Sequence, residues 1–184
     1  MENLRIGFIG LGNVGGKLAG NLLNNGADLT VRDLNPELVA EFVARGAKSA
    51  ASPKEMIENC DVVITCLPSP AASAAVLEAD DGIIAGMSPG KVWMEMSTTD
   101  SAEIKRLAPL VEAKGGLAME CPVSGGCHRA ATGNIAIFAG GPRAGFERVL
   151  PVLTILGREV LHTGDLGGQA TTREVTQAVC ALLA

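Results

Sequence analysis

The sequence predicts an α/β fold, in which a mostly parallel sheet carries helices on both of its faces. Short apolar runs alternate with longer amphipathic stretches from the first residues to about Gly164, and this alternation is typical of repeated βαβ units. Helix start signals mark the same boundaries, because a capping residue precedes proline at Asn35–Pro36 and at Ser52–Pro53. The 184 residues, 47% of them hydrophobic, suffice for one well-packed core.

The apolar runs define the expected strands and the amphipathic stretches the expected helices. The strands are expected at Leu4–Ile9, Asp28–Arg32, Val62–Cys66, Lys91–Met96, Leu117–Cys121, Ile135–Ala139 and Val160–Thr163. The helices are expected at Val14–Asn24, Pro36–Ala44, Pro53–Glu58, Ser101–Lys114 and Pro142–Leu153. Residues 164–184 differ, because a glycine-rich link is followed there by apolar residues at helical spacing.

Charge and composition argue against several classes of partner. A net charge of −5 without any run of lysine or arginine is unlike a nucleic-acid-binding surface. No apolar run approaches the roughly 18 residues of a membrane-spanning helix, and the first residues do not resemble a secretory signal, so we expect a cytoplasmic protein with no membrane partner. Five cysteines without CxxC spacing predict reduced thiols and no metal site.

A glycine-rich turn follows the first expected strand and opens the first expected helix. In "IGFIGLGNVGG" the pattern GxGxxG assigns a tight turn to Gly10, close approach of a pyrophosphate to Gly12, and close packing of helix against strand to Gly15. This context predicts a Rossmann-type, doubly wound sheet that binds a dinucleotide; the alternative is that the glycines serve turns alone. The turn residues expected to bind the cofactor are Gly10, Leu11, Gly12, Asn13, Val14 and Gly15.

An acidic residue follows the second expected strand at the offset where dinucleotide-binding proteins hold the adenosine ribose. A carboxylate at Asp33 would accept hydrogen bonds from the 2′ and 3′ hydroxyls and would repel a 2′-phosphate, which favours NAD over NADP. Arg32 tempers this preference, because its guanidinium could pair with a phosphate. The alternative role of Asp33 is to cap its own loop.

Four separated motifs resemble the β-hydroxyacid dehydrogenases, the family of 3-hydroxyisobutyrate dehydrogenase, tartronate semialdehyde reductase and 6-phosphogluconate dehydrogenase. They are "GFIGLGNVGGKLAGNL", "CLPSP", "MEMSTTD" and "ECPVSGGCHRAATGNIAIFAGG", and the resemblance runs from Arg5 to about Gln177. It implies an NAD(P)-dependent enzyme that transfers hydride between nicotinamide and a small 3-hydroxy acid or its aldehyde or keto form.

The resemblance also implies roles for the ends of two central strands. Leu67 and Pro68 should lie along the adenosine side of the cofactor, and Thr98 should lie close to the nicotinamide. Glu95 stands where relatives usually have aspartate. Without the resemblance, Leu67 and Pro68 would be read as an ordinary strand exit, and the residues around Thr98 as a helix cap.

The run "PVSGG" is the substrate loop of the family, and its chemistry can be read from its residues. Ser124 offers a hydroxyl, while Gly125 and Gly126 leave backbone amides uncovered, so together they could cradle a carboxylate. This favours a small carboxylic acid as substrate. A plain proline-glycine turn is the alternative.

The sequence departs from the family pattern at the catalytic position. Arg173 stands where the family has its catalytic lysine, and Gln177 where an asparagine holds the substrate. Hydride transfer needs a group that takes the hydroxyl proton, and arginine, with a pKa above about 12, is a poor base. We therefore expect weakened oxidation of hydroxy acids.

The resemblance divides the chain into residues 1–163, a dinucleotide-binding domain, and residues 164–184, a glycine-rich link with a truncated interdomain helix and no complete second domain. The apolar stripe in that helix predicts a homo-oligomer; it consists of Val175, Val179, Leu182 and Leu183. Three functions remain open: an NAD-dependent dehydrogenase, a catalytically impaired NAD-binding module, and an interaction scaffold.

Overall fold

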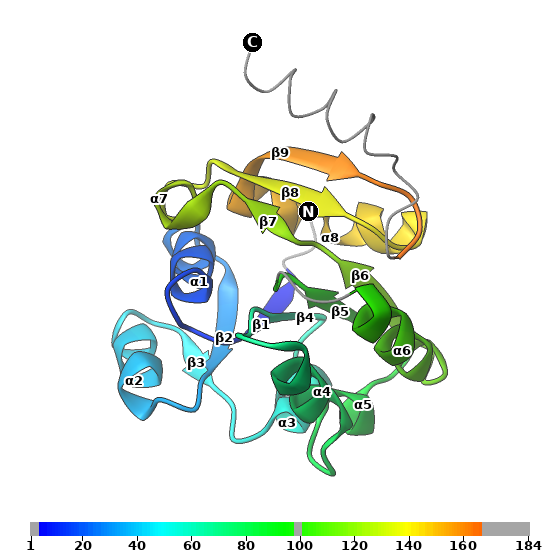
Figure 1. The fold of residues 1–184 in the computed structure, drawn as a ribbon. Helices are drawn as coiled ribbons and strands as arrows, with labels where there is room; N and C mark the ends of the chain where they lie inside the picture. Colours follow the sequence, from blue (N-terminus) through cyan, green and yellow to red (C-terminus); the bar gives the residue numbers. More distant parts are fainter. Residues whose placement is uncertain (1–3, 98–100, 167–184) are drawn as a thin grey trace.

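The computed structural model describes residues 4–97 and 101–166, which form a six-stranded sheet with helices on both faces and a smaller sheet above it (Figure 1). The six strands are all parallel, in the order β3-β2-β1-β4-β5-β6. They are β1 (Arg5–Ile9), β2 (Asp28–Arg32), β3 (Lys48–Ser49), β4 (Val62–Thr65), β5 (Val92–Glu95) and β6 (Leu117–Glu120). The predicted Rossmann-type fold is confirmed, because this is the strand order of a doubly wound dinucleotide-binding sheet.

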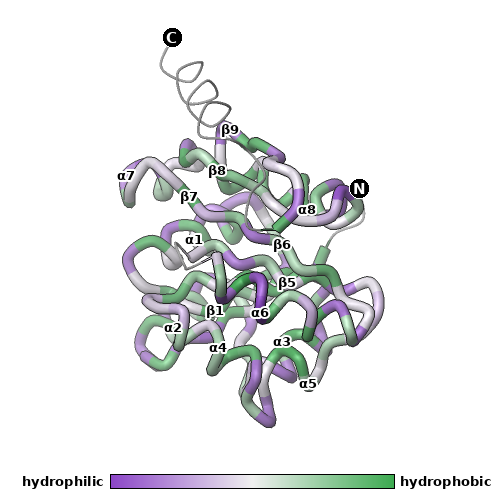
Figure 2. The backbone as a smooth tube through the Cα atoms, turned by 45° about the vertical axis from the view of Figure 1, so that its right-hand side comes forward, coloured by the Kyte–Doolittle hydropathy of each residue, from purple (hydrophilic) through white to green (hydrophobic). Residues whose placement is uncertain are grey.

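The helices pack in two groups on opposite faces of the sheet. One face carries α1 (Gly15–Asn24), α2 (Pro36–Ala44) and α8 (Arg143–Leu156). The other carries α3 (Pro53–Asn59), α4 (Pro70–Glu78), α5 (Ile83–Gly86) and α6 (Ser101–Glu112). Figure 2 shows hydrophilic stretches in the outermost turns, as at the end of α7 (Gly126–Ala131).

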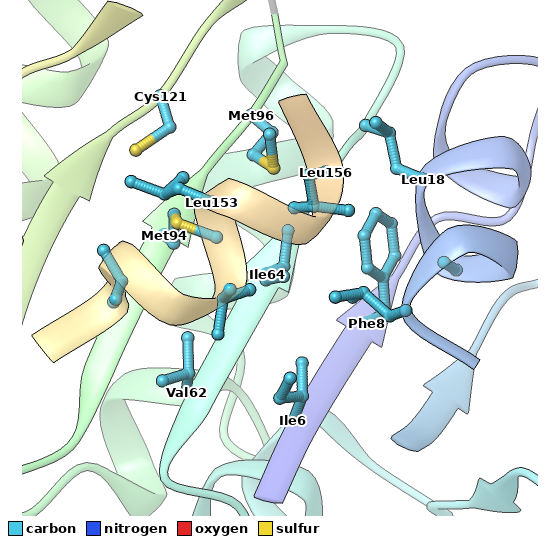
Figure 3. Close-up of a cluster of buried hydrophobic side chains, with 14 of the residues drawn as sticks. Ile6, Phe8, Leu18, Val62, Ile64, Met94, Met96, Cys121, Leu153 and Leu156 are labelled. Carbon is cyan, nitrogen blue, oxygen red and sulfur yellow. The ribbon is translucent and has the colours of Figure 1, made fainter. Parts of the chain in front are cut away.

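Two apolar cores lie on the two faces of the sheet. All four residues of β4 are buried, so this central strand is a continuous apolar run rather than an alternating one. Ile64 faces the core under α8, whereas Val63 faces the core under α3 and α6. Figure 3 shows Leu156 of α8 near Ile64 and Phe8, and Leu153 near Met94. Packing on both faces of the sheet therefore fixes the positions of the strand ends, and the site is built at those ends.

Side-chain caps start the helices where the sequence predicts them. The side chain of Asn35 accepts a hydrogen bond from the Glu37 amide, and Ser52 accepts one from the Glu55 amide, each before a proline at the first helical position. Ser69 starts α4 in the same way, although the sequence analysis did not predict that helix.

The strands after β6 form a separate sheet, which the sequence analysis did not foresee. This sheet has the order β7-β8-β9 and contains β7 (Val123–Ser124), β8 (Ile135–Ala139) and β9 (Gly157–His162). β7 is antiparallel to β8, and β9 is parallel to it. β7 has two residues, which are too few to give an apolar run in the sequence. The charged residues Arg158 and Glu159 interrupt the apolar pattern at the start of β9. No helix in the two described ranges is long and apolar enough to cross a membrane.

Lys91 ties the start of β5 to the end of α3. Its Nζ donates hydrogen bonds to the carbonyls of Ile57, Glu58 (2.9 Å) and Cys60 (2.8 Å), which are acceptors that a helix end leaves without an internal partner. We expect Lys91→Met to lower the free energy of unfolding by about 2 kcal/mol, because three charge-assisted hydrogen bonds to carbonyls at the helix end are lost. Urea titration followed by the fluorescence of Trp93, the one tryptophan in the sequence, measures the change.

Lys54→Met is the matched control for that change. Lys54 belongs to α3 itself, but its pairing with Glu58 is an exposed 4.0 Å contact, which should contribute less than about 0.5 kcal/mol. Equal losses in the two variants would contradict the role given to Lys91.

A paired arginine and aspartate join the starts of β1 and β4. Arg5 donates to both carboxylate oxygens of Asp61, through Nε at 3.1 Å and Nη2 at 2.9 Å, and this pairing lowers the pKa of Asp61 from 3.8 to about 2. A lowered pKa contributes stability above pH 4 that is lost as the pH falls toward 2. After discounting for solvent screening of a pair at the surface, we expect about 1 kcal/mol.

Asp61→Asn tests this pH dependence. The variant should be less stable than the parent chain at pH 6, and the difference should shrink toward pH 2, where protonation of the parent carboxylate sets in. Urea titrations at the two pH values measure it, and a difference that is the same at both would count against the assignment.

Candidate functional site

A cleft of about 800 Å³ lies at the carboxyl ends of β1, β2, β4 and β5, where the strand order reverses direction. Open α/β sheets bind ligands at this topological switch point. Eight residues predicted to bind a cofactor line the cleft: Gly10, Gly12, Asn13, Val14, Gly15, Asp33, Leu67 and Pro68. Residues as far apart in sequence as Gly10 and Pro68 are thereby brought together at one edge of the sheet.

The three glycines of the turn differ in what surrounds them, as the sequence predicts. A Cβ on Gly10, whose φ is +99°, would lie 2.3 Å from the Cys66 carbonyl oxygen, and one on Gly15 would lie 2.0 Å from the Gly10 oxygen. A Cβ on Gly12 would meet nothing within 4 Å. Gly10 and Gly15 are therefore required by the fold itself, whereas Gly12 leaves its backbone open toward the cleft.

The N-terminus of α1 points into this turn without a capping side chain. Val14 occupies the N-cap position, where no side chain of the described residues caps the free helix amides, and the first turn of the helix contains no acidic residue. Helix amides and the helix dipole favour an anion at such an end. The site therefore fits a pyrophosphate, whose oxygens would take the place of a cap.

Asp33 is held in place by two backbone amides. Its Oδ2 accepts a hydrogen bond from Leu11 (2.6 Å), and its Oδ1 accepts one from Asn35 (2.8 Å). These contacts show that Asp33 caps its loop and also joins β2 to the glycine turn. Leu11 enters the site through this amide, while its side chain is buried in the core.

A hydrogen-bonded link joins the ends of β4 and β5 below the cleft. The Leu67 amide donates to Ser97 Oγ (2.7 Å), and the Ser97 amide donates to Oε1 of the buried Glu95 (2.8 Å). Burial raises the pKa of Glu95, and hydrogen bonds from neighbouring hydroxyls partly offset that effect. Burial also raises the pKa of the Cys66 thiol, which lines the cleft, to about 12, so this thiol is neutral.

The predicted substrate loop lies beside the cleft rather than in its wall. Val123 lines the cleft, while Ser124, Gly125 and Gly126 follow it as an exposed turn into α7. Both glycines have positive φ, +132° and +75°. Asn21 of α1 donates a hydrogen bond from Nδ2 to the Ala130 carbonyl of α7, so the loop is anchored to the helix whose other end faces the cleft.

Three predicted site residues lie outside the described ranges: Thr98, Arg173 and Gln177. Sequence reasoning missed four apolar residues that line the cleft, from α2, from the segment before it and from α4: Leu34, Leu38, Ala75 and Val76. The Ser69–Pro70 start signal could have located α4. Within residues 4–97 and 101–166 no group of histidine, cysteine or acidic side chains could hold a metal ion.

Comparison with known proteins agrees with this geometry. The family profile described as "NAD binding domain of 6-phosphogluconate dehydrogenase" matches residues 5–164. A 3-hydroxyisobutyrate dehydrogenase from Pseudomonas aeruginosa is 38% identical over 162 residues, which are 88% of this chain and 54% of the relative. A 2-(hydroxymethyl)glutarate dehydrogenase from Eubacterium barkeri is 32% identical over 166 residues, 90% of this chain and 55% of the relative.

A solved structure gives the same result for the fold. The crystal structure of a 3-hydroxyisobutyrate dehydrogenase from Salmonella typhimurium superimposes with a TM-score of 0.83 and 32% identity, covering 97% of this chain and 61% of that one. The chain thus spans about half the length of the curated relatives that it matches. From the matched profile, the strand order and the glycine turn together, this chain belongs to the family of NAD-binding domains typified by 6-phosphogluconate dehydrogenase.

Proposed function

We propose that this chain is the cofactor-binding unit of an NAD-dependent β-hydroxyacid dehydrogenase. The observation that carries the proposal is the cleft at the switch point, where the uncapped N-terminus of α1, the open backbone at Gly12 and the anchored carboxylate of Asp33 occur together. The first two suit a pyrophosphate and the third a ribose. When bound, the nicotinamide would accept or donate the hydride.

A preference for NAD over NADP is supported by Asp33 and by the position of Arg32. The Asp33 carboxylate lies on the cleft wall, where it would repel a 2′-phosphate and accept hydrogen bonds from ribose hydroxyls. Arg32 also lines the cleft, but its Nη1 donates to the carbonyls of Ala50 (3.2 Å) and Ala51 (2.5 Å). Turning this guanidinium toward a phosphate would break those bonds.

The substrate class follows from the loop beside the cleft and from the relatives. Ser124 and the uncovered amides of Gly125 and Gly126 suit a carboxylate. The acids named for the relatives, 3-hydroxyisobutyrate and 2-(hydroxymethyl)glutarate, share a hydroxymethyl group on the carbon that bears the carboxylate. We propose an acid of this kind, or its aldehyde, as the substrate.

Arg173 and Gln177 complete the proposal on sequence grounds alone. Arg173 would hold the carboxylate or steady a developing oxyanion, and Gln177 would bond to the substrate. Because arginine is a poor base, oxidation should be slow, and Arg173→Lys should raise turnover of 3-hydroxyisobutyrate with NAD⁺.

The test combines cofactor binding with turnover. NADH should quench the fluorescence of Trp93 by energy transfer and bind more tightly than NADPH, and turnover should separate an enzyme from a binding module. Absence of NADH binding would overturn the proposal and favour an interaction scaffold.

We also propose a homo-oligomer that buries the apolar stripe of residues 164–184. Val175, Val179 and Leu182 recur at helical spacing and would present apolar surface to a second copy. A monodisperse monomer in light scattering at high protein concentration would contradict this proposal.

A further inference from the structure

The carboxyl group of Glu95 is fully buried beneath the cofactor cleft, at the end of β5. Burying an acid is unfavourable unless its oxygens find hydrogen-bond partners. Oε1 of Glu95 has two, the backbone amide of Ser97 at 2.8 Å and the hydroxyl of the same serine. These two hydrogen bonds fix the position of Ser97, which follows the end of β5.

Ser97 connects the buried Glu95 to the residues that line the cleft. Its hydroxyl proton is donated to Glu95, and its oxygen accepts the Leu67 amide at 2.7 Å, thirty positions earlier in the sequence. Ser97 and Leu67 both line the cleft. A continuous chain of hydrogen bonds thus runs from the buried acid to the point where the β4 exit meets the cleft.

The other oxygen of Glu95 is unpaired within the described ranges, as is one serine hydroxyl of α4. Oε2 of Glu95 and Oγ of Ser73 are both buried, and neither has a hydrogen-bond partner among the described residues. Ser73 also lowers the pKa of Glu95, which places its hydroxyl close to the carboxyl group. A proton on Oε2 would be donated to Ser73, and this contact would satisfy both atoms at once.

The surroundings favour such a proton. Burial is the largest effect on Glu95 and raises its pKa, and the groups that oppose it are hydroxyls and an amide. Cys66 and Cys121 are titratable groups beside it, and burial raises the pKa of both thiols, so both are neutral. With a proton on Oε2, Glu95 would be a neutral carboxylic acid that accepts with one oxygen and donates with the other.

We propose that Glu95 is a positioning residue for the cofactor site, which holds the β4 exit, the β5 exit and α4 at a fixed spacing. Ser97 and Leu67 form one side of the cleft, and Ala72 and Ala75, which flank Ser73 on α4, form another. The inference rests on the cofactor binding proposed above. It adds that the shape of the cleft depends on an acid that the cofactor does not reach.

Three variants separate positioning from charge. Glu95→Gln should preserve NADH affinity, because its amide can accept from Ser97 and donate to Ser73 as the neutral acid does. Glu95→Leu should raise the Kd for NADH about tenfold, because the whole chain of hydrogen bonds is lost. Ser97→Ala removes the link alone and should approach the same value, which covers the case in which the leucine variant fails to fold.

Three further measurements keep this result distinct from a general loss of stability and from the proposed function. Hydrogen exchange at the Leu67 amide should speed up about tenfold in Glu95→Leu and Ser97→Ala but not in Glu95→Gln, with or without cofactor. Lys91→Met, a destabilised variant with its change at the far end of β5, should keep the parent NADH affinity. An infrared band of a protonated carboxyl group should vanish in Glu95→Gln.

The outcomes are separable. If the parent chain binds no NADH, the proposed function fails. The rate of hydrogen exchange at the Leu67 amide then decides by itself whether Glu95 fixes the β4 exit beside the cleft. If Glu95→Gln loses affinity as fully as Glu95→Leu, the charge of a carboxylate matters and the positioning role is overturned. Unchanged Leu67 exchange in Ser97→Ala would overturn it as well.

Discussion

Gly12→Val is expected to abolish NADH binding while leaving the fold intact. A Cβ at Gly12 meets no atom within 4 Å, so this position is open space in the protein itself. The same Cβ would occupy the space that the cofactor phosphates need, next to the uncapped amides of α1. Losing several hydrogen bonds to phosphate should weaken binding more than about a hundredfold. Fluorescence titration with NADH and urea titration measure the two effects separately.

Two other glycines of the same segment provide controls. Gly20→Ala lies on α1, where the new Cβ would have an ordinary 3.7 Å contact with Arg45, so binding should be unchanged and stability slightly higher. Gly15→Ala should instead destabilise the protein, because its Cβ would lie 2.0 Å from the Gly10 carbonyl oxygen. If Gly12→Val binds NADH normally, the cleft does not hold the pyrophosphate at this turn.

Asp33→Asn is expected to shift the cofactor preference toward NADPH. Asparagine keeps one side-chain oxygen that can accept the Leu11 amide, which preserves the bond from β2 to the glycine turn, whereas the bond from the Asn35 amide is lost. The negative charge that would oppose a 2′-phosphate is removed, and two charges about 4 Å apart interact strongly enough to change the ratio of NADPH to NADH affinity by roughly thirtyfold. Titration of the parent and variant with both cofactors gives the ratio.

Asp81→Asn is the matched control for this change. Asp81 also lines the cleft, but it comes from the segment after α4 and not from the end of β2. Its substitution should leave the ratio of the two affinities unchanged. A shift in both variants would show that the general charge of the cleft, and not the position of Asp33, sets the preference.

The sequence predicts the parts of the fold that local chemistry determines. The central strands are buried on both faces, so β1, β4 and β5 appear as apolar runs, and the asparagine and serine caps show where α2 and α3 begin. The glycine turn is equally local, because the roles of Gly10 and Gly15 follow from backbone conformation and close packing. These features are visible in the spacing of residues within each segment, although the Cys66 carbonyl that excludes a Cβ at Gly10 comes from the end of another strand.

The rest depends on contacts between distant segments. The separate sheet of β7, β8 and β9 arises because the chain after β6 turns back, with an antiparallel bridge between Glu120 and Gly140 that no local pattern announces. The link from Glu95 through Ser97 to Leu67 joins positions thirty apart, and neither serine nor glutamate shows in sequence that it will be buried. Asp33 was predicted for its charge, but its bond to Leu11 required the structure.

The bond from Asn21 to Ala130 sets a condition for engineering this protein. A designer who wants to change substrate choice would exchange the segment from Val123 to Ala131 for that of a relative. Asn21 of α1 would then face a backbone that no longer offers the Ala130 carbonyl in the same place. Any resulting shift of α1 would also move its other end, where the glycine turn lies. The transferable unit is therefore the loop together with α1, two pieces about a hundred residues apart that must be moved as one.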